Sequence, residues 1–191
     1  LIDEAKREAT LLLESLTPYV ERGVPIVGLE PSCVFTIKDE LPVLIPGEPS
    51  KRLAEHVQLL EEYLVTEKNA GRLNLKFRTT GHEKVLLHGH CHQKAFDAVD
   101  STVKLLESVP GIEVETIPSS CCGMAGSFGY QAEHYEVSME MAELSLLPRV
   151  RQAKASEQIA ACGTSCRHQI EHGSGRSVQH PLSVLRHALA D

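Results

Sequence analysis

The sequence lacks the features that mark nucleic-acid-binding, membrane-spanning and secreted proteins. Its 19 Lys and Arg residues are outnumbered by 26 Asp and Glu residues, and the formal charge of −7 argues against a basic face that could contact phosphates. No apolar run approaches the roughly 20 residues that a membrane-spanning helix requires, and no signal sequence opens the chain. We therefore expect no nucleic-acid partner, no transmembrane segment and a cytoplasmic location, with peripheral membrane association as an open alternative.

Linkers and low-complexity segments are also absent. The chain has 191 residues, of which 42% are hydrophobic and 24% charged, so it can bury the core of one ordinary domain. No stretch is rich enough in Pro, Gly or Ser to divide it, and we expect a single domain over residues 1–191. The chain begins at Leu1 without an initiator Met, in the middle of an amphipathic pattern, which suggests a piece of a longer polypeptide.

The pattern of apolar residues predicts an alternation of strands and helices. Runs typical of strands lie at 25–29, 85–88, 112–116 and 158–161, with a further candidate at 177–179. Helical spacing covers 1–21, 50–64, 95–106, 132–153 and 181–190, with Ser50 as an N-cap and a bend near Pro148. Repeated strand–loop–helix units predict an α/β domain with a largely parallel sheet and helices on both faces.

The sequence has no Trp but six cysteines, and all six lie in one kind of structural place. Each follows the carboxyl end of an expected strand and precedes an expected helix: Cys33, Cys91, Cys121, Cys122, Cys162 and Cys166. In open α/β sheets ligands bind at this edge, where helix amino termini stabilise negative charge. We therefore expect Cys91, Cys121, Cys122 and Cys166 to converge there, although they lie on three separate loops.

The spacing of these cysteines favours a polynuclear metal centre. Cys121 and Cys122 are adjacent, and neighbouring side chains rarely both reach one small ion. Iron–sulfur clusters contain several irons held by thiolates, so they suit such a pair better. Gly123 and Gly126 would let the backbone approach the cluster closely and donate N–H groups to its sulfurs. Two alternatives stay open: a zinc-stabilised interaction domain, and a thiol–disulfide enzyme that uses the adjacent pair.

Several histidines accompany the cysteines. His88, His90 and His92 alternate, so on an extended segment they would face the same way. We expect them to donate hydrogen bonds around the cluster, and direct metal ligation is the alternative. The same expectation applies to His168. The candidates for groups that surround the metal ligands are therefore His90, His92, Gly123 and His168.

Four motifs together span most of the chain: Gly28–Cys33, His88–Ala95, Ser119–Tyr130 and Gly163–Ile170. In this order they resemble the cysteine-rich CCG domain, which is also found in heterodisulfide reductase. The closer resemblance is to the carboxy-terminal iron–sulfur part of FAD-linked D-2-hydroxy-acid dehydrogenases. It implies a Rossmann-like fold with the cysteine motifs at the carboxyl-terminal edge of the strands.

The resemblance also implies a set of ligands. Such domains have two related halves, each with a Cys, a Cys-Cys-Gly and a final Cys. One complete set, which would hold a cluster of the 4Fe–4S type, is matched by Cys91, Cys121, Cys122 and Cys166. Cys33 matches the last cysteine of the other half, whose earlier cysteines are absent from the chain, as in a truncated first half. Cys162 lies four residues before Cys166 instead of three, so it departs from the family's spacing.

The function that the resemblance implies is electron transfer within a larger oxidoreductase. FAD on an upstream domain would oxidise a D-2-hydroxy acid of the D-lactate, glycolate or 2-hydroxyglutarate class. Electrons would pass through a ferredoxin-like segment to this domain, and then to a quinone or another acceptor. The chain alone would not be catalytic, and zinc could replace iron in its cysteine site.

Overall fold

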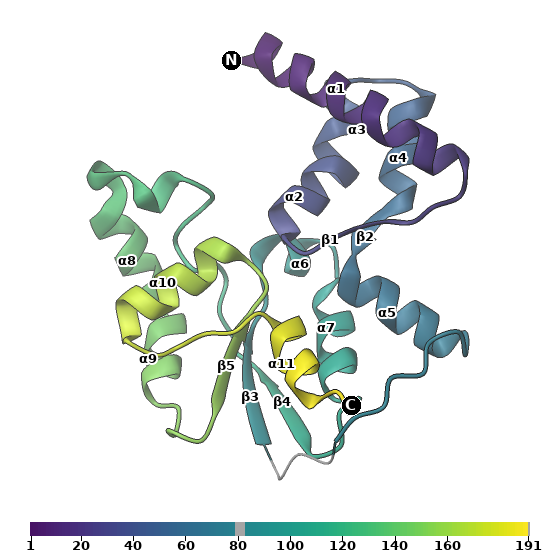
Figure 1. Ribbon diagram of the computed structural model, residues 1–191. Helices are drawn as coiled ribbons and strands as arrows, with labels where there is room; N and C mark the ends of the chain where they lie inside the picture. The colour runs from purple at the N-terminus through teal and green to yellow at the C-terminus, as the bar shows by residue number, and fades with distance from the viewer. Residues whose placement is uncertain (79–82, 191) are drawn as a thin grey trace. The chain divides into compact units, whose positions relative to one another are not determined.

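The computed structural model describes residues 1–78 and 83–190, and its element order confirms the expected α/β class (Figure 1). The chain divides into two compact units, Leu1–Tyr63 and Leu64–Asp191. The prediction that residues 1–191 form one cysteine-rich domain is not tested by this division and stays a prediction. Within the described ranges, no helix combines the length and the apolar character that crossing a bilayer requires.

The first unit combines helices with one pair of parallel strands. Its elements are α1 (Ile2–Glu21), β1 (Ile26–Gly28), α2 (Pro31–Phe35), the π-helical turn η1 (Thr36–Glu40), α3 (Leu41–Leu44), α4 (Glu48–His56) and β2 (Val57–Leu59). The strands β1 and β2 are parallel, with Ile26 opposite Val57. The buried side chains of Val20, Leu41 and Leu53 join α1, α3 and α4 in one small core.

The prediction of a single helix at 50–64 is wrong. The structure has α4 and α5 (Leu60–Asn69), separated by the strand β2. Val57 and Leu59 are fully buried, so their spacing of two residues is that of a strand, although it also fits a helical pattern. Ser50 is not the N-cap, because α4 begins at Glu48 and the Ser50 hydroxyl donates to the carbonyl of Gly47 at 2.9 Å.

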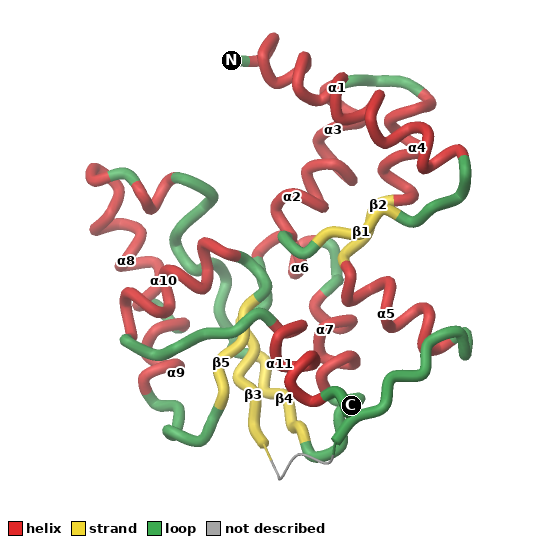
Figure 2. Tube along the Cα trace, viewed as in Figure 1, coloured by secondary structure: helices red, strands yellow, loops and turns green. Residues whose placement is uncertain are grey.

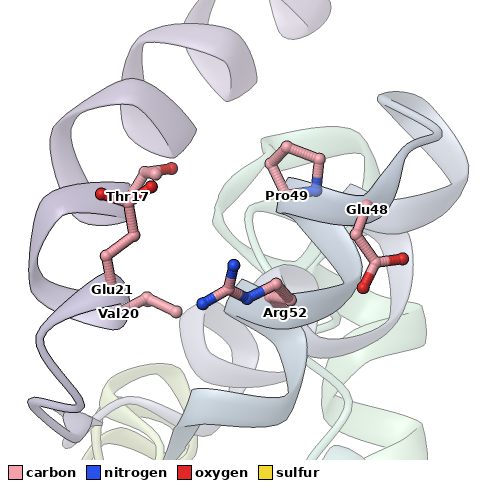
Figure 3. Close-up of a pocket in the computed structure, with 6 residues that line it drawn as sticks. All are labelled: Thr17, Val20, Glu21, Glu48, Pro49 and Arg52. Atoms are coloured by element: carbon pink, nitrogen blue, oxygen red, sulfur yellow. The ribbon is translucent and has the colours of Figure 1, made fainter.

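A small cavity of about 90 Å³ lies between α1 and α4 of the first unit (Figure 3). It is lined by Thr17, Val20, Glu21, Glu48, Pro49 and Arg52. Figure 3 shows the Arg52 guanidinium pointing across the cavity toward α1. None of the six lining residues is Cys or His, so this cavity is not part of the cysteine site.

The second unit contains a three-stranded parallel sheet with the order β4-β3-β5. Its elements are β3 (Glu83–His88), α6 (Cys91–Ala95), α7 (Val99–Leu106), β4 (Ile112–Thr116), the 3₁₀ turns η2 (Phe128–Tyr130) and η3 (Ala132–His134), α8 (Tyr135–Glu143), α9 (Leu146–Arg151), β5 (Gln158–Ala161), α10 (Thr164–Ser174) and α11 (Pro181–Ala188). The chain runs from the central β3 to β4 on one side and then to β5 on the other. Such a switch point creates a ligand crevice at the carboxyl ends of the strands.

Helices cover both faces of this sheet, as expected (Figure 2). Successive side chains of β3 point to opposite faces. Leu86 packs in a core with Val150 of α9 and Ile170 of α10. Its neighbours Val85 and Leu87 pack in a second core with residues of α7 and α11. The two cores hold the sheet rigid beneath the loops that carry the cysteines.

The helix expected at 95–106 is in fact two helices. The chain leaves α6 at Phe96, and Asp97 adopts a left-handed conformation with φ of 55° before α7 begins at Val99. The apolar spacing continues across this break, which is why the pattern predicted one helix. As a consequence, α6 is a short helix whose first residue is Cys91.

Two expectations near the carboxyl terminus also need correction. The pattern at 132–153 is broken between α8 and α9, at residues 144–145, so the break precedes Pro148. Pro148 lies in the first turn of α9, where the missing N–H of proline removes no helical hydrogen bond. The segment 177–179 is not a strand, because Gln179 forms only an isolated bridge with Ala160.

Candidate metal centre

Four cysteines meet at the carboxyl-terminal edge of the second unit's sheet. Cys91 is the first residue of α6 after β3, Cys121 and Cys122 lie in the loop after β4, and Cys166 lies in the first turn of α10 after β5. Their thiols form a hydrogen-bonded row that runs from Cys91 through Cys121 and Cys122 to Cys166. The structure therefore brings together side chains from three loops, separated by up to 75 residues in sequence.

The row of thiols favours negative charge at two of its members. The hydrogen bond with Cys122, followed by that with Cys91, holds the pKa of Cys121 far below its usual range. The hydrogen bond with Cys122, together with the nearby imidazoles of His88 and His90, lowers the pKa of Cys166 to about 5, although burial opposes this shift. Hydrogen bonding to Cys121 raises the pKa of both Cys91 and Cys122. Cys121 and Cys166 are thus the thiols that give up protons most readily.

His88 is a buried histidine that faces the thiols. A ring nitrogen of His88 and the sulfurs of Cys122 and Cys166 all lie within 4.8 Å of one another. Its Nδ1 lies 2.8 Å from the hydroxyl of Ser119, which can itself donate to the carbonyl of Ile117 at 3.5 Å. When Nδ1 accepts from the Ser119 hydroxyl, the ring proton is on Nε2. Nε2–H has no oxygen or nitrogen acceptor within the described residues, and its donation to a thiolate is the way in which His88 lowers the pKa of Cys166.

His90 caps the helix that begins with Cys91. The His90 Nδ1 accepts from the backbone N–H of His92 at 3.2 Å, and the backbone N–H of His90 donates to the Gln93 side-chain oxygen at 3.1 Å. This is a capping box in which histidine takes the usual place of Ser or Thr. It was not expected from the sequence, although Gln93 stands three residues after His90. Because Nδ1 accepts this capping hydrogen bond, the His90 ring stabilises the first turn of the helix that begins at Cys91.

His92 lies beside Cys91, and both residues are half-buried. Its Nδ1 is 3.7 Å from the Cys91 sulfur, and the His90 Nδ1 is 3.8 Å from the same sulfur. The two imidazole rings are stacked with centroids 5.2 Å apart. The structure therefore places both histidines beside a candidate ligand, where the sequence predicted groups that surround the metal.

Gly123 and Gly163 allow the segments that carry the cysteines to pack closely against their neighbours. Gly123 has φ of 90°, its N–H donates to the Cys121 sulfur at 3.3 Å, and a Cβ atom there would lie 2.1 Å from the Ser138 carbonyl oxygen. At Gly163 a Cβ atom would lie 2.4 Å from the His90 ring. Any larger residue at either position would displace the segments that carry the cysteines.

Lys94 is a further residue near the thiols that was not expected from the sequence. Its ammonium group donates to the backbone carbonyls of Ser119 and Ser120, at 3.0 Å for the latter. Burial lowers the pKa of Lys94, and the charges of the four thiols oppose this shift, beginning with Cys166. Lys94 thereby ties α6 to the loop that leads into Cys121 and places a cation beside the thiols. No spacing rule links residues so far apart, so the sequence held no signal for it.

The remaining candidates lie elsewhere. Cys33 is exposed in α2 of the first unit, and none of the six cysteines, all of which lie in the described ranges, forms a disulfide. Cys162 is buried, with its sulfur 4.0 Å from the hydroxyl of Thr102, and it does not join the row of four thiols. His168 is exposed on α10, and its Nδ1 lies 2.7 Å from the Tyr130 hydroxyl.

The donor set fits a thiolate-bound metal centre. Four sulfurs, two of them with depressed pKa, meet at the carboxyl-terminal edge of the sheet beside the buried imidazole of His88. Thiolates are the ligands of iron–sulfur clusters, and thiolates with imidazole also suit zinc. The His88, Cys122 and Cys166 group could supply three ligands to one zinc ion, whereas the full row of sulfurs suits a polynuclear group.

Comparison with curated proteins finds similarity to dehydrogenases along most of the chain. The chain is 30% identical over 190 residues, 98% of its length, to a subunit of the anaerobic glycerol-3-phosphate dehydrogenase of Escherichia coli (strain K12), and covers 46% of that protein. It is 29% identical over 180 residues, 94% of its length, to D-2-hydroxyglutarate dehydrogenase of Pantoea ananatis, and covers 17% of it. It is 30% identical over 175 residues, 89% of its length, to the Pseudomonas putida protein of the same name, and covers 16% of it.

These relatives are dehydrogenases or dehydrogenase subunits, and the chain spans less than half the length of each. No family model matches the chain. No solved structure matches it either. The homologues confirm the resemblance drawn from the motifs: the chain fits a cysteine-rich CCG-type domain of FAD-linked dehydrogenases.

Proposed function

We propose that the chain is the electron-transfer module of an FAD-linked dehydrogenase, and that Cys91, Cys121, Cys122 and Cys166 hold an iron–sulfur cluster of the 4Fe–4S type. The observation that carries this proposal is the meeting of four thiols from three loops at the switch point of the sheet. A structural zinc site holds a single ion, with four ligands at tetrahedral positions around it. Four sulfurs including an adjacent pair supply the spread of donors that a polynuclear group requires.

A bound cluster would supply one-electron transfer, and the surrounding residues have separate tasks. Cys122 and Cys166 are buried, so their side of the site excludes water. The Gly123 N–H donates to a ligand sulfur, a contact that stabilises negative charge there. Lys94 adds a positive charge beside the four thiols. His88 presents a buried ring nitrogen to the sulfurs of Cys122 and Cys166 and lowers the pKa of Cys166.

Cys33 and Cys162 receive different assignments. We do not assign Cys162 to this cluster, because its sulfur contacts Thr102 and its thiol does not take part in the row of four. We propose that Cys33 belongs to a second, related set of ligands, since it follows β1 in the way that Cys166 follows β5. His90 and His92 are assigned to the surroundings of Cys91.

For the whole protein we propose oxidation of a D-2-hydroxy acid of the D-lactate, glycolate or 2-hydroxyglutarate class by FAD on another segment. Electrons would then pass through a ferredoxin-like segment and this chain to a quinone or another acceptor. The relatives named D-2-hydroxyglutarate dehydrogenase support this substrate class. Glycerol 3-phosphate is the second candidate, since the relative that carries its name matches 98% of the chain. Six free cysteines support a reducing compartment such as the cytoplasm.

The direct test is anaerobic reconstitution of the chain with ferrous iron and sulfide. We expect uptake of both iron and sulfide, with visible thiolate-to-iron charge-transfer absorption. The Cys122→Ser variant should lose most of the iron and sulfide uptake and of the absorption, because a hydroxyl is a poor ligand for iron. Cys162→Ser is the matched control and should keep both, since that thiol is buried but lies outside the row. Tight zinc binding without any uptake of sulfide would instead support the zinc-stabilised alternative.

A further inference from the structure

A cavity of about 310 Å³ lies in the second unit, beside α10. Its lining includes Met124, Tyr130, Tyr135, His168, Gln169 and His172. None of the lining residues is Lys, Arg, Asp or Glu, so the cavity offers no permanently charged partner to a phosphate or carboxylate. Its volume falls within the range of about 300–1,000 Å³ that is typical of small-molecule sites. An uncharged ligand with an aromatic or quinonoid ring suits such a lining.

Two tyrosine–histidine pairs line this cavity. The Tyr130 hydroxyl lies 2.7 Å from His168 Nδ1, and the Tyr135 hydroxyl lies 2.9 Å from His172 Nε2. In both pairs the rings meet edge to face, at centroid distances of 6.1 and 5.8 Å. His168 and His172 are four residues apart on α10, so their backbones are about 6 Å apart along the helix. The two pairs therefore lie about one turn apart on the same helix, where each can reach a different one of the two para oxygens of one six-membered ring.

The lining also carries an unused acceptor. Gln169 is 4% exposed, and its amide nitrogen donates to the carbonyl and the hydroxyl of Ser138, at 3.1 and 2.9 Å. These two bonds use the nitrogen side of the amide and leave its oxygen available as an acceptor. A hydroxyl on a bound ring could donate to that oxygen, and the ring of a hydroquinone carries such hydroxyls.

The cavity wall is continuous in sequence with the metal centre. Met124 follows Cys122 by two residues, and His168 follows Cys166 by two. The segments that line the cavity are therefore the segments that carry two of the four proposed ligands.

We infer that this cavity binds the ring of a para-quinone or its hydroquinone, with the Tyr130–His168 and Tyr135–His172 pairs hydrogen-bonding the two ring oxygens. The inference rests on the proposed function for the role of that ring as an electron acceptor, but the binding itself needs no metal. It concerns the ring alone, and the two hydroxyl–imidazole pairs set the specificity for oxygens in para positions.

The test uses the chain as it stands and tetramethyl-1,4-benzoquinone, whose ring has no open carbon to which the free cysteines could add. Saturation-transfer NMR on the methyl protons measures binding, and the separate hydroquinone signal reports any reduction by thiols. We expect saturable binding that weakens about tenfold or more in the Tyr130→Phe/Tyr135→Phe double variant, because two hydrogen bonds are lost while both rings stay. Tyr19→Phe, in the first unit, is the matched control and should bind as the unmodified chain does.

Absence of saturable binding, or equal affinity in the double variant, would overturn the inference. Iron and sulfide uptake is measured on the same variants, so that the quinone-binding cavity and the proposed metal centre are tested separately. Loss of quinone binding with normal uptake in the double variant supports the cavity and leaves the metal centre untouched. Failure of the unmodified chain to take up iron would overturn the proposed function, while the binding result would still decide the question of the cavity.

Discussion

Gly123 is a residue whose backbone and surroundings both demand the absence of a side chain. Its φ of 90° is unfavourable for any L residue, and a Cβ atom would meet the Ser138 carbonyl oxygen at 2.1 Å. Gly126, three residues later in the same loop, also has a positive φ of 67°, but nothing lies within 4 Å of its Cβ position. Substitution of Gly126 therefore tests backbone strain alone, whereas substitution of Gly123 tests backbone strain together with steric exclusion.

We predict that Gly123→Ala lowers the free energy of unfolding by about 3 kcal/mol, from positive-φ strain and overpacking together. Gly126→Ala should lose about 1 kcal/mol, since only the strain applies. Urea unfolding followed by circular dichroism measures both values. Equal losses in the two variants would mean that the close approach of Gly123 to α8 contributes nothing.

The residue types at the site could be predicted from the sequence, but several of their contacts could not. The position of each cysteine after a strand follows from local patterns, and parallel topology then brings their loops to one edge. The contact between His88 and Ser119, and that of Lys94 with Ser120, join residues 26 to 31 positions apart. These contacts depend on how α6 packs against the loop after β4, which no local pattern encodes.

At the scale of elements, Glu115 links two strands and a helix. From β4 it forms ion pairs with Lys84 of β3 and Arg149 of α9, both at 2.7 Å. The hydrogen bond from Arg149, followed by that from Lys84, lowers the pKa of Glu115 to about 2. A carboxyl group whose pKa is lower in the folded state stabilises the fold above its unfolded pKa, and this contribution is lost as the pH falls.

We predict that Glu115→Gln destabilises the chain at pH 7 and that its deficit relative to the unmodified chain shrinks as the pH falls from about 4.5 toward 2. Chemical unfolding at a series of pH values measures this difference. Glu136→Gln provides the control, because Glu136 forms no ion pair within the described residues. A deficit that stays constant between pH 7 and about pH 3 would contradict the assignment.

Element types were predictable where apolar spacing was unambiguous, as in α1, β3, β4 and β5. The errors occurred where two periods overlap. Val57 and Leu59 fit both a helix and a strand, and pairing with β1 decided for the strand. The break at Asp97 was hidden because the apolar residues on either side keep helical spacing. Long-range pairing and a single left-handed residue therefore overrode local pattern.

At the scale of the whole molecule, the proposed function assigns substrate oxidation and electron delivery to different segments. The chain covers 46% of one relative and 16–17% of the D-2-hydroxyglutarate dehydrogenases, so flavin chemistry is assigned to segments outside it. The cysteine centre and the adjacent cavity are assigned to the later transfer of electrons.

In the full-length dehydrogenase, we predict that Cys122→Ser abolishes steady-state quinone reduction and leaves flavin reduction by the substrate intact. Under the proposed function, loss of a thiolate ligand interrupts the relay, whereas the flavin reaction is assigned to another segment. Anaerobic stopped-flow bleaching of the flavin measures the first half-reaction, and Cys162→Ser should change neither. Equal loss of both half-reactions in folded Cys122→Ser protein would mean that this domain takes part in substrate oxidation.

The most direct test of the central claim is X-ray absorption at the iron edge of the reconstituted chain. If Cys91, Cys121, Cys122 and Cys166 hold an iron–sulfur cluster, the nearest scatterers should be sulfur alone, with an iron–iron distance that marks a polynuclear centre. Both features should weaken in Cys121→Ser and persist in Cys162→Ser. A shell of nitrogen and oxygen neighbours without any iron–iron scattering would contradict the presence of a cluster on these four thiols.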